Sequence, residues 1–71
     1  MTTAERIKEL RLSRNLSQKQ LSEFVQLSER GIQNYELDTR EPKLSALIAL
    51  ADFFDVSLDY LVGRSDNPMR F

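Results

Sequence analysis

The side chains of this chain that are best suited to chemistry lie near its middle, and the chemistry they suit is hydrogen bonding to nucleic-acid bases. Arginine pairs well with guanine, asparagine or glutamine pairs with adenine, and glutamate accepts from the amino group of cytosine. These residue types share one face of a helix predicted to begin after Ser28, as Glu29, Arg30, Gln33 and Asn34. The alternative is a solvated face that recognises nothing, which most surface helices have.

The composition argues against enzymatic chemistry. The 71 residues include no cysteine and no histidine. The chain therefore has no thiolate, and it lacks histidine, which is the commonest general base and the commonest metal ligand. Ser17, Ser28 and Ser57 are predicted to cap helices, and no histidine is available to activate them as nucleophiles. We expect no enzymatic activity, no cofactor and no bound metal.

Two short helices joined by a sharp turn are predicted to position the polar face. Ser17 is a good N-cap, and Gln20, three residues later, completes a capping box. Ser28 is the predicted N-cap of the second helix, and only residues 25–27 are left for the turn. This arrangement is typical of a helix-turn-helix, whose second helix fits a DNA major groove.

Hydrophobic periodicity predicts three more helices and no strand, which gives an all-α fold. The first helix directs Ile7, Leu10 and Arg11 inward, and the second buries Leu21, Val25 and part of Phe24. The five predicted helices cover residues 4–14, 18–25, 29–37, 44–54 and 58–62. We expect one domain over residues 1–63, followed by a C-terminal tail over residues 64–71.

These residues, in this order and spacing, resemble the helix-turn-helix of the Cro/C1-type (Xre-like) bacterial and phage repressors. The matching residues are Leu16, Ser17, Gln18, Leu21, Leu27, Ser28, Ile32, Tyr35, Glu36 and Pro42. Further matches upstream and downstream extend the resemblance over roughly residues 4 to 63. The resemblance implies a five-helix, lambda-repressor-like DNA-binding domain.

The resemblance also implies roles for individual residues. Gln18 matches a glutamine that binds a backbone phosphate and braces the recognition helix, and Lys19 adds charge beside it. Arg40 and Lys43 lie in a loop that typically meets phosphate. Glu29, Arg30, Gln33 and Asn34 occupy base-facing positions, where Glu29 either accepts from cytosine or repels phosphate. Arg11 and Glu36 match a largely buried ion pair of the family.

Three positions depart from the family pattern. Gln26 and Asp38 stand where glycine is common, so each must tolerate a positive φ or shift its turn. Gly31 replaces a residue that often touches base or sugar, and it lowers helix propensity by up to about 1 kcal/mol relative to alanine.

The charge balance is unusual for a DNA-binding domain, which is often basic. The net charge is −1, with ten basic and eleven acidic residues. The first 43 residues sum to +1 (eight basic, seven acidic) and the remainder to −2 (two basic, four acidic). We therefore expect modest non-specific affinity, with more dependence on specific contacts and on dimerisation.

The sequence thus predicts a DNA-binding transcriptional regulator, a repressor that binds a palindromic operator as a homodimer. The alternative is a protein-interaction module of the same fold, such as an antirepressor or an antitoxin-like partner, without DNA affinity. No apolar run approaches the roughly 20 residues of a membrane span, and no signal-peptide pattern appears, so we expect a cytoplasmic protein.

Dimerisation is expected through the C-terminal helices, because they hold more apolar residues than one small core needs. These residues are Leu47, Ile48, Leu50, Phe53, Phe54, Leu58, Leu61 and Val62, with Met69 and Phe71 in the tail.

Overall fold

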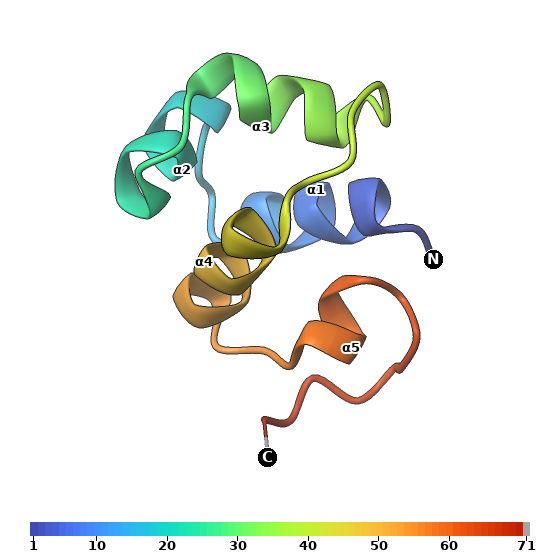
Figure 1. The fold of residues 1–71 in the computed structure, drawn as a ribbon. Coiled ribbons are helices and arrows are strands. Elements are labelled where there is room, and N and C mark those ends of the chain that lie inside the picture. The colour runs from blue at the N-terminus through green and yellow to red at the C-terminus, as the bar shows by residue number, and fades with distance from the viewer. Residues whose placement is uncertain (71) are drawn as a thin grey trace.

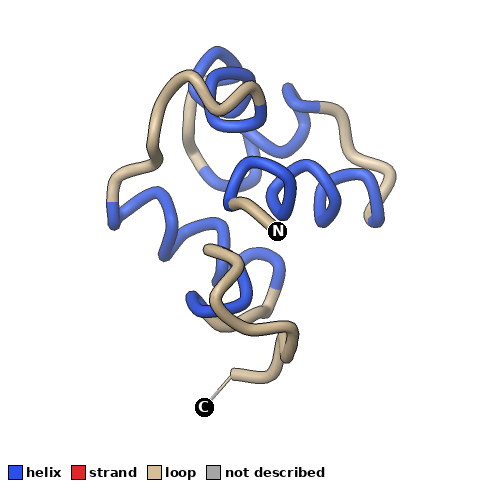
Figure 2. Tube along the Cα trace, turned by 90° about the vertical axis from the view of Figure 1, so that its right-hand side faces the viewer, coloured by secondary structure: helices blue, strands red, loops and turns tan. Residues whose placement is uncertain are grey.

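The computed structural model describes residues 1–70, and within that part of the chain it contains five α-helices and no strand (Figures 1 and 2). The all-α prediction is confirmed. The helices are α1 (Thr3–Ser13), α2 (Gln18–Val25), α3 (Glu29–Glu36), α4 (Leu44–Phe54) and α5 (Leu58–Leu61). Each bound lies within one residue of the predicted one. Phe71, which we assigned to the apolar tail, lies outside the described residues.

The core draws one fully buried side chain from every helix. In Figure 1, α1 lies across the middle of the molecule, with α2 and α3 on one side and α4 and α5 on the other. The five side chains that meet there are Ile7, Leu21, Ile32, Leu50 and Leu61. Because α2 and α3 both pack on this shared centre, the relative placement of the two helices is fixed by apolar contacts.

The helix starts are specified locally by hydroxyl caps. Thr2 with Glu5, and Ser17 with Gln20, form complete capping boxes. The Ser28 hydroxyl accepts from the backbone N–H of Gly31 at 2.9 Å, which caps α3. The predicted caps of these helices are confirmed.

Several helices end on a residue with left-handed backbone. Gln26 has φ 58° and Asp38 has φ 60°, so both tolerate the conformation that glycine usually supplies. Asn15, which follows the Arg14 C-cap of α1, has φ 57°. The turn of the helix-turn-helix is therefore built without glycine.

The prediction that α2 buries part of Phe24 is wrong, because 63% of this residue is exposed. Leu21 and Val25, at i and i+4, fill the inward face of this short helix, and Phe24 lies about 100° away from Val25 around the axis. Its ring instead stacks on Phe53 of α4, with the centroids 5.3 Å apart.

Arg6 is buried, which the sequence analysis did not foresee. Its guanidinium lies 3.6 Å from the centroid of the Tyr60 ring, so α1 and α5 meet in a cation–π contact. The nearest carboxylates, those of Glu9 and Asp66, are 3.6 and 3.7 Å away. The Arg6 Nε has no hydrogen-bond partner within residues 1–70.

We predict that Arg6→Met changes the free energy of unfolding by less than about 1 kcal/mol. The substitution loses a cation–π contact but removes a buried unsatisfied donor, and it leaves Glu9 and Asp66 in solvent. Urea unfolding followed by circular dichroism measures the difference. A loss above about 2 kcal/mol would show that the ring contact dominates.

None of the described helices is long and apolar enough to cross a membrane.

Candidate nucleic-acid interface

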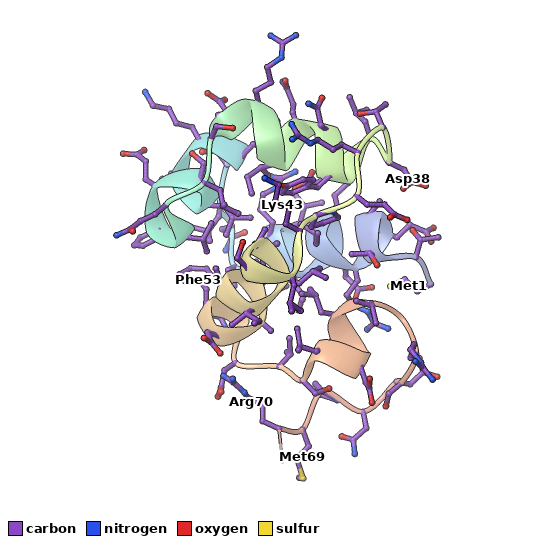
Figure 3. All side chains as sticks on the ribbon, viewed as in Figure 1. Met1, Asp38, Lys43, Phe53, Met69 and Arg70 are labelled. Carbon is purple, nitrogen blue, oxygen red and sulfur yellow. The ribbon has the colours of Figure 1, made fainter. Side chains whose placement is uncertain are left out.

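The polar face of α3 is mostly exposed to solvent. Its side chains project away from the helical body in Figure 3. Glu29, Arg30 and Gln33 are exposed, and Asn34 is half-buried. On the opposite face Ile32 is completely buried, and this anchor fixes the rotation of the helix. The four residues with base-reading side chains therefore share one accessible helix face.

The start of α2 lies against α3 and adds a second group of polar side chains. Gln18 and Lys19 occupy the first turn of α2, directly after the Ser17 cap. The Gln18 amide Nε2 donates to Glu36 Oε1 at 3.2 Å, so this side chain bridges α2 and the end of α3. Lys19 is exposed beside it. The structure thus places Gln18 in contact with the end of α3, and Lys19 follows it in the first turn of α2.

Arg11 and Glu36 form the ion pair that joins α1 to α3. Arg11 Nε donates to Glu36 Oε2 at 2.7 Å, and Nη2 donates to Oε1 at 2.9 Å, which is a bidentate geometry. The side chains of the two residues are 10% and 4% exposed. The carboxylate is therefore largely withdrawn from water and depends on this partner.

The third donor of the guanidinium links the pair to the helix-turn-helix itself. Arg11 Nη1 donates to the backbone carbonyl of Leu16 at 2.8 Å, just before the Ser17 cap of α2. The sequence analysis missed this contact. Together with Gln18, the network ties α1, the start of α2 and the end of α3 to one carboxylate.

Hydrogen bonding to Glu36 keeps the Arg11 guanidinium charged. Donation of hydrogen bonds to Glu36 raises the pKa of the Arg11 guanidinium above its ordinary value, and the opposing effect of burial is smaller. Arg11 therefore stays protonated across the pH range in which proteins fold.

The loop between α3 and α4 presents Arg40 and Lys43. Both residues are exposed, and Lys43 lies at the N-cap of α4 (Figure 3). Within residues 1–70, no hydrogen bond or ion pair joins either side chain to α2 or α3. The structure therefore leaves both cations accessible, although it does not join them to the recognition helix as it does Gln18.

Gly31 leaves the first turn of α3 without a side chain at its centre. A Cβ atom added there would lie 3.0 Å from Ser28 Oγ, the hydroxyl that caps this helix, and 3.9 Å from the Tyr35 hydroxyl. The glycine has no positive φ to accommodate. Its main structural consequence is an uncrowded cap.

The comparisons with known proteins agree with this geometry. The profile of the helix-turn-helix family matches residues 7–61. An uncharacterised HTH-type transcriptional regulator of Bacillus subtilis (strain 168), YobD, is 34% identical over 64 residues, which cover 90% of this chain and 57% of that protein. The HTH-type transcriptional regulator ImmR of the same bacterium is 33% identical over 66 residues, covering 93% of this chain and 52% of that protein. This chain thus spans a little over half the length of these two curated relatives.

A solved structure extends the likeness to three dimensions. The P22 c2 repressor, crystallised in complex with a synthetic operator, is 29% identical and matches with a TM-score of 0.85. The match covers 92% of this chain and 98% of that one.

Proposed function

The chain belongs to the helix-turn-helix family, and on that premise we propose that it binds DNA sequence-specifically and regulates transcription. The observation that supports the proposal most strongly is the face of α3, where Glu29, Arg30, Gln33 and Asn34 share one accessible surface. The fold of the chain matches that of a repressor solved in complex with a synthetic operator.

In this proposal α3 enters the major groove, and Arg30, Gln33 and Asn34 contact base edges. Gln18 and Lys19, at the start of α2, contact the phosphate backbone on one side. Arg40 and Lys43 contact it from the loop after α3. The Arg11–Glu36 pair touches no DNA, but it holds α3 and the Gln18 amide at a fixed separation.

We propose further that the protein is a repressor that acts as a homodimer on a palindromic operator. Several apolar side chains of the C-terminal half are buried, but Leu44, Ile48, Leu58 and Met69 remain exposed. A two-fold dimer through this surface would present two recognition helices to half-sites about 34 Å apart. The 29 × 21 × 21 Å dimensions of the described chain suit two copies lying side by side at that spacing.

The alternative function, a protein-interaction module without DNA affinity, is favoured by the net charge of −1. The alternative predicts no association with DNA even at low ionic strength, where phosphate contacts are strongest.

We predict that Lys19→Ala weakens binding to all duplex sequences about equally and reduces the slope of log K against log salt by about one. Lys8→Ala is the matched control, because it removes the same charge from the exposed side of α1. Fluorescence anisotropy titrations at several salt concentrations measure both slopes. An unchanged slope for Lys19→Ala would remove this residue from the interface.

A further inference from the structure

Leu37 is an exposed apolar residue at the end of the recognition helix. With 68% of its surface exposed, it is the most exposed large hydrophobic residue within residues 1–70. It occupies the C-cap of α3 with right-handed helical backbone, and its N–H donates to the Gln33 carbonyl at 3.0 Å. Leu37 therefore completes the last turn of α3, and helical spacing determines the direction of its side chain.

This spacing places Leu37 on the proposed base-reading face. Leu37 follows Gln33 by four positions and Arg30 by seven, and residues at these spacings share one side of a helix. At about 100° per residue, Leu37 lies about 20° around the axis from Arg30 and about 140° from the buried Ile32. Its side chain is thus directed away from the core, between the directions of Gln33 and Asn34.

The fold does not depend on the Leu37 side chain. Backbone groups close the turn after α3, where the Asp38 N–H donates to the Tyr35 carbonyl at 3.2 Å and the Thr39 N–H donates to the Asn34 carbonyl at 3.0 Å. Leu37 belongs neither to the core cluster nor to the hydrophobic residues packed against it. Exposed leucines are common on protein surfaces, so the inference depends on the position of Leu37 rather than on its exposure alone.

The chemistry of the side chain limits what it can recognise. An isobutyl group neither donates nor accepts a hydrogen bond, and the apolar group that bases present in the major groove is the C5-methyl of thymine. Contact between the two would remove apolar surface of both from water. The seven positions from Arg30 to Leu37 span about 10.5 Å along the helix, roughly three base-pair steps. The thymine would therefore lie within about three base pairs of the base that Arg30 contacts.

We propose that Leu37 is a specificity-determining residue, which selects a thymine by contact with its C5-methyl group. The inference rests on the proposed function, because it assigns one more base contact to the same face of α3. Arg30 then reads its base through hydrogen bonds, and Leu37 reads another through apolar contact. Because such a contact releases no counterion, its loss lowers affinity without changing the slope of log K against log salt.

The test removes the methyl group from the DNA and the side chain from the protein, separately and together. Each thymine of the preferred duplex site is replaced in turn by deoxyuridine, which lacks only the C5-methyl. Fluorescence anisotropy gives the Kd of wild type, Leu37→Ala and Leu12→Ala for each duplex. Leu12→Ala is the matched control, because it truncates a leucine that is 53% exposed on α1. Thermal melts establish that all three proteins are folded.

We expect deoxyuridine at one position of a half-site to raise the Kd of wild type about threefold to fivefold, as for the loss of one buried methyl group. Leu37→Ala should distinguish the thymine and deoxyuridine duplexes by less than about twofold, because its contact is already lost. Leu12→Ala should keep the wild-type difference.

A preferred site in which no thymine is sensitive to loss of its methyl group would overturn the inference, as would equal sensitivity in wild type and Leu37→Ala. An equal loss of affinity for every duplex in Leu37→Ala would place the side chain on the sugar-phosphate backbone and would overturn it too. In each of these cases wild type still binds DNA, so the proposed function would stand. A wild type that binds no duplex at low ionic strength would overturn the proposed function and the inference with it.

Discussion

Replacing Arg11 with methionine is expected to lower the free energy of unfolding by about 3–5 kcal/mol, the largest stability effect that we predict. The reason is that Glu36 would lose its charged partner. Its side chain is only 4% exposed, and its carboxylate accepts both hydrogen bonds of the bidentate pair. Without Arg11, the carboxylate keeps only the Gln18 amide as a partner. A domain with about 5–15 kcal/mol of stability loses a large share of it.

A double substitution separates two contributions to the lost free energy of unfolding: the unpaired buried charge of Glu36 and the loss of packing around Arg11. Arg11→Met combined with Glu36→Leu is expected to recover much of the stability, because no buried charge remains. Lys8→Met, on the exposed side of α1, is the control and should stay within about 0.5 kcal/mol of wild type. Thermal and urea unfolding of wild type, Arg11→Met, Glu36→Leu and the double substitution completes the cycle, with Lys8→Met measured beside them. A melt of Arg11→Met that matches wild type would contradict a structural role for the pair.

Arg30→Ala is expected to weaken binding to the preferred DNA site by about 1–3 kcal/mol, the largest effect that we predict on binding. Arg30 is exposed on the face of α3 opposite its buried anchor, where a guanidinium can reach the O6 and N7 atoms of guanine. The loss should be confined to one base pair of each half-site, so discrimination at that position should relax.

The measurement is a set of titrations of wild type and Arg30→Ala against the preferred site and its single-base variants. Arg64→Ala is the control, because Arg64 closely follows α5, and α5 lies at the opposite end of the molecule from α3 (Figure 1). A loss that is equal for every sequence would place Arg30 on phosphate rather than on a base. No loss at all would remove it from the interface.

Local signals in the sequence predicted the elements well, because the determinants of helix ends are themselves local. The hydroxyls of Thr2, Ser17 and Ser28 satisfy N–H groups within three residues of themselves. Gln26 adopts the left-handed conformation that the short turn requires. Each of these features depends on neighbours along the chain and so can be read without knowledge of the fold.

Features that depend on distant partners were not predicted. The burial of Arg6 requires Tyr60, which lies 54 positions away along the chain, and no periodicity links the two. Phe24 is exposed because Leu21 and Val25 fill the inward face of α2, and its one aromatic contact is with Phe53 of α4, far away along the chain. The course of residues 64–70 depends on Arg70 pairing with Asp52 and Asp55 and on the hydrogen bond from Ser57 N–H to the Pro68 carbonyl. Packing geometry decides all three, and the hydrophobic pattern alone does not contain it.

The candidate site was predicted from the sequence only in part. The accessible face of α3 follows from helical spacing around Ile32, which the sequence contains. The hydrogen bond from Gln18 to Glu36 and the one from Arg11 to the Leu16 carbonyl depend on how three helices meet. The structure therefore adds a feature that the sequence pattern does not show, in which the Glu36 carboxylate joins Arg11 of α1 and Gln18 of α2 to the end of α3.

The central claim is that this chain binds DNA through α3, and a random duplex pool tests it most directly. The purified protein is incubated with the pool at low ionic strength, and retained sequences are determined over successive rounds. The account predicts retention that falls with added salt, and enrichment of one motif with two-fold symmetry that Arg30→Ala fails to select. No salt-dependent retention of any sequence would contradict the account and favour the protein-interaction module.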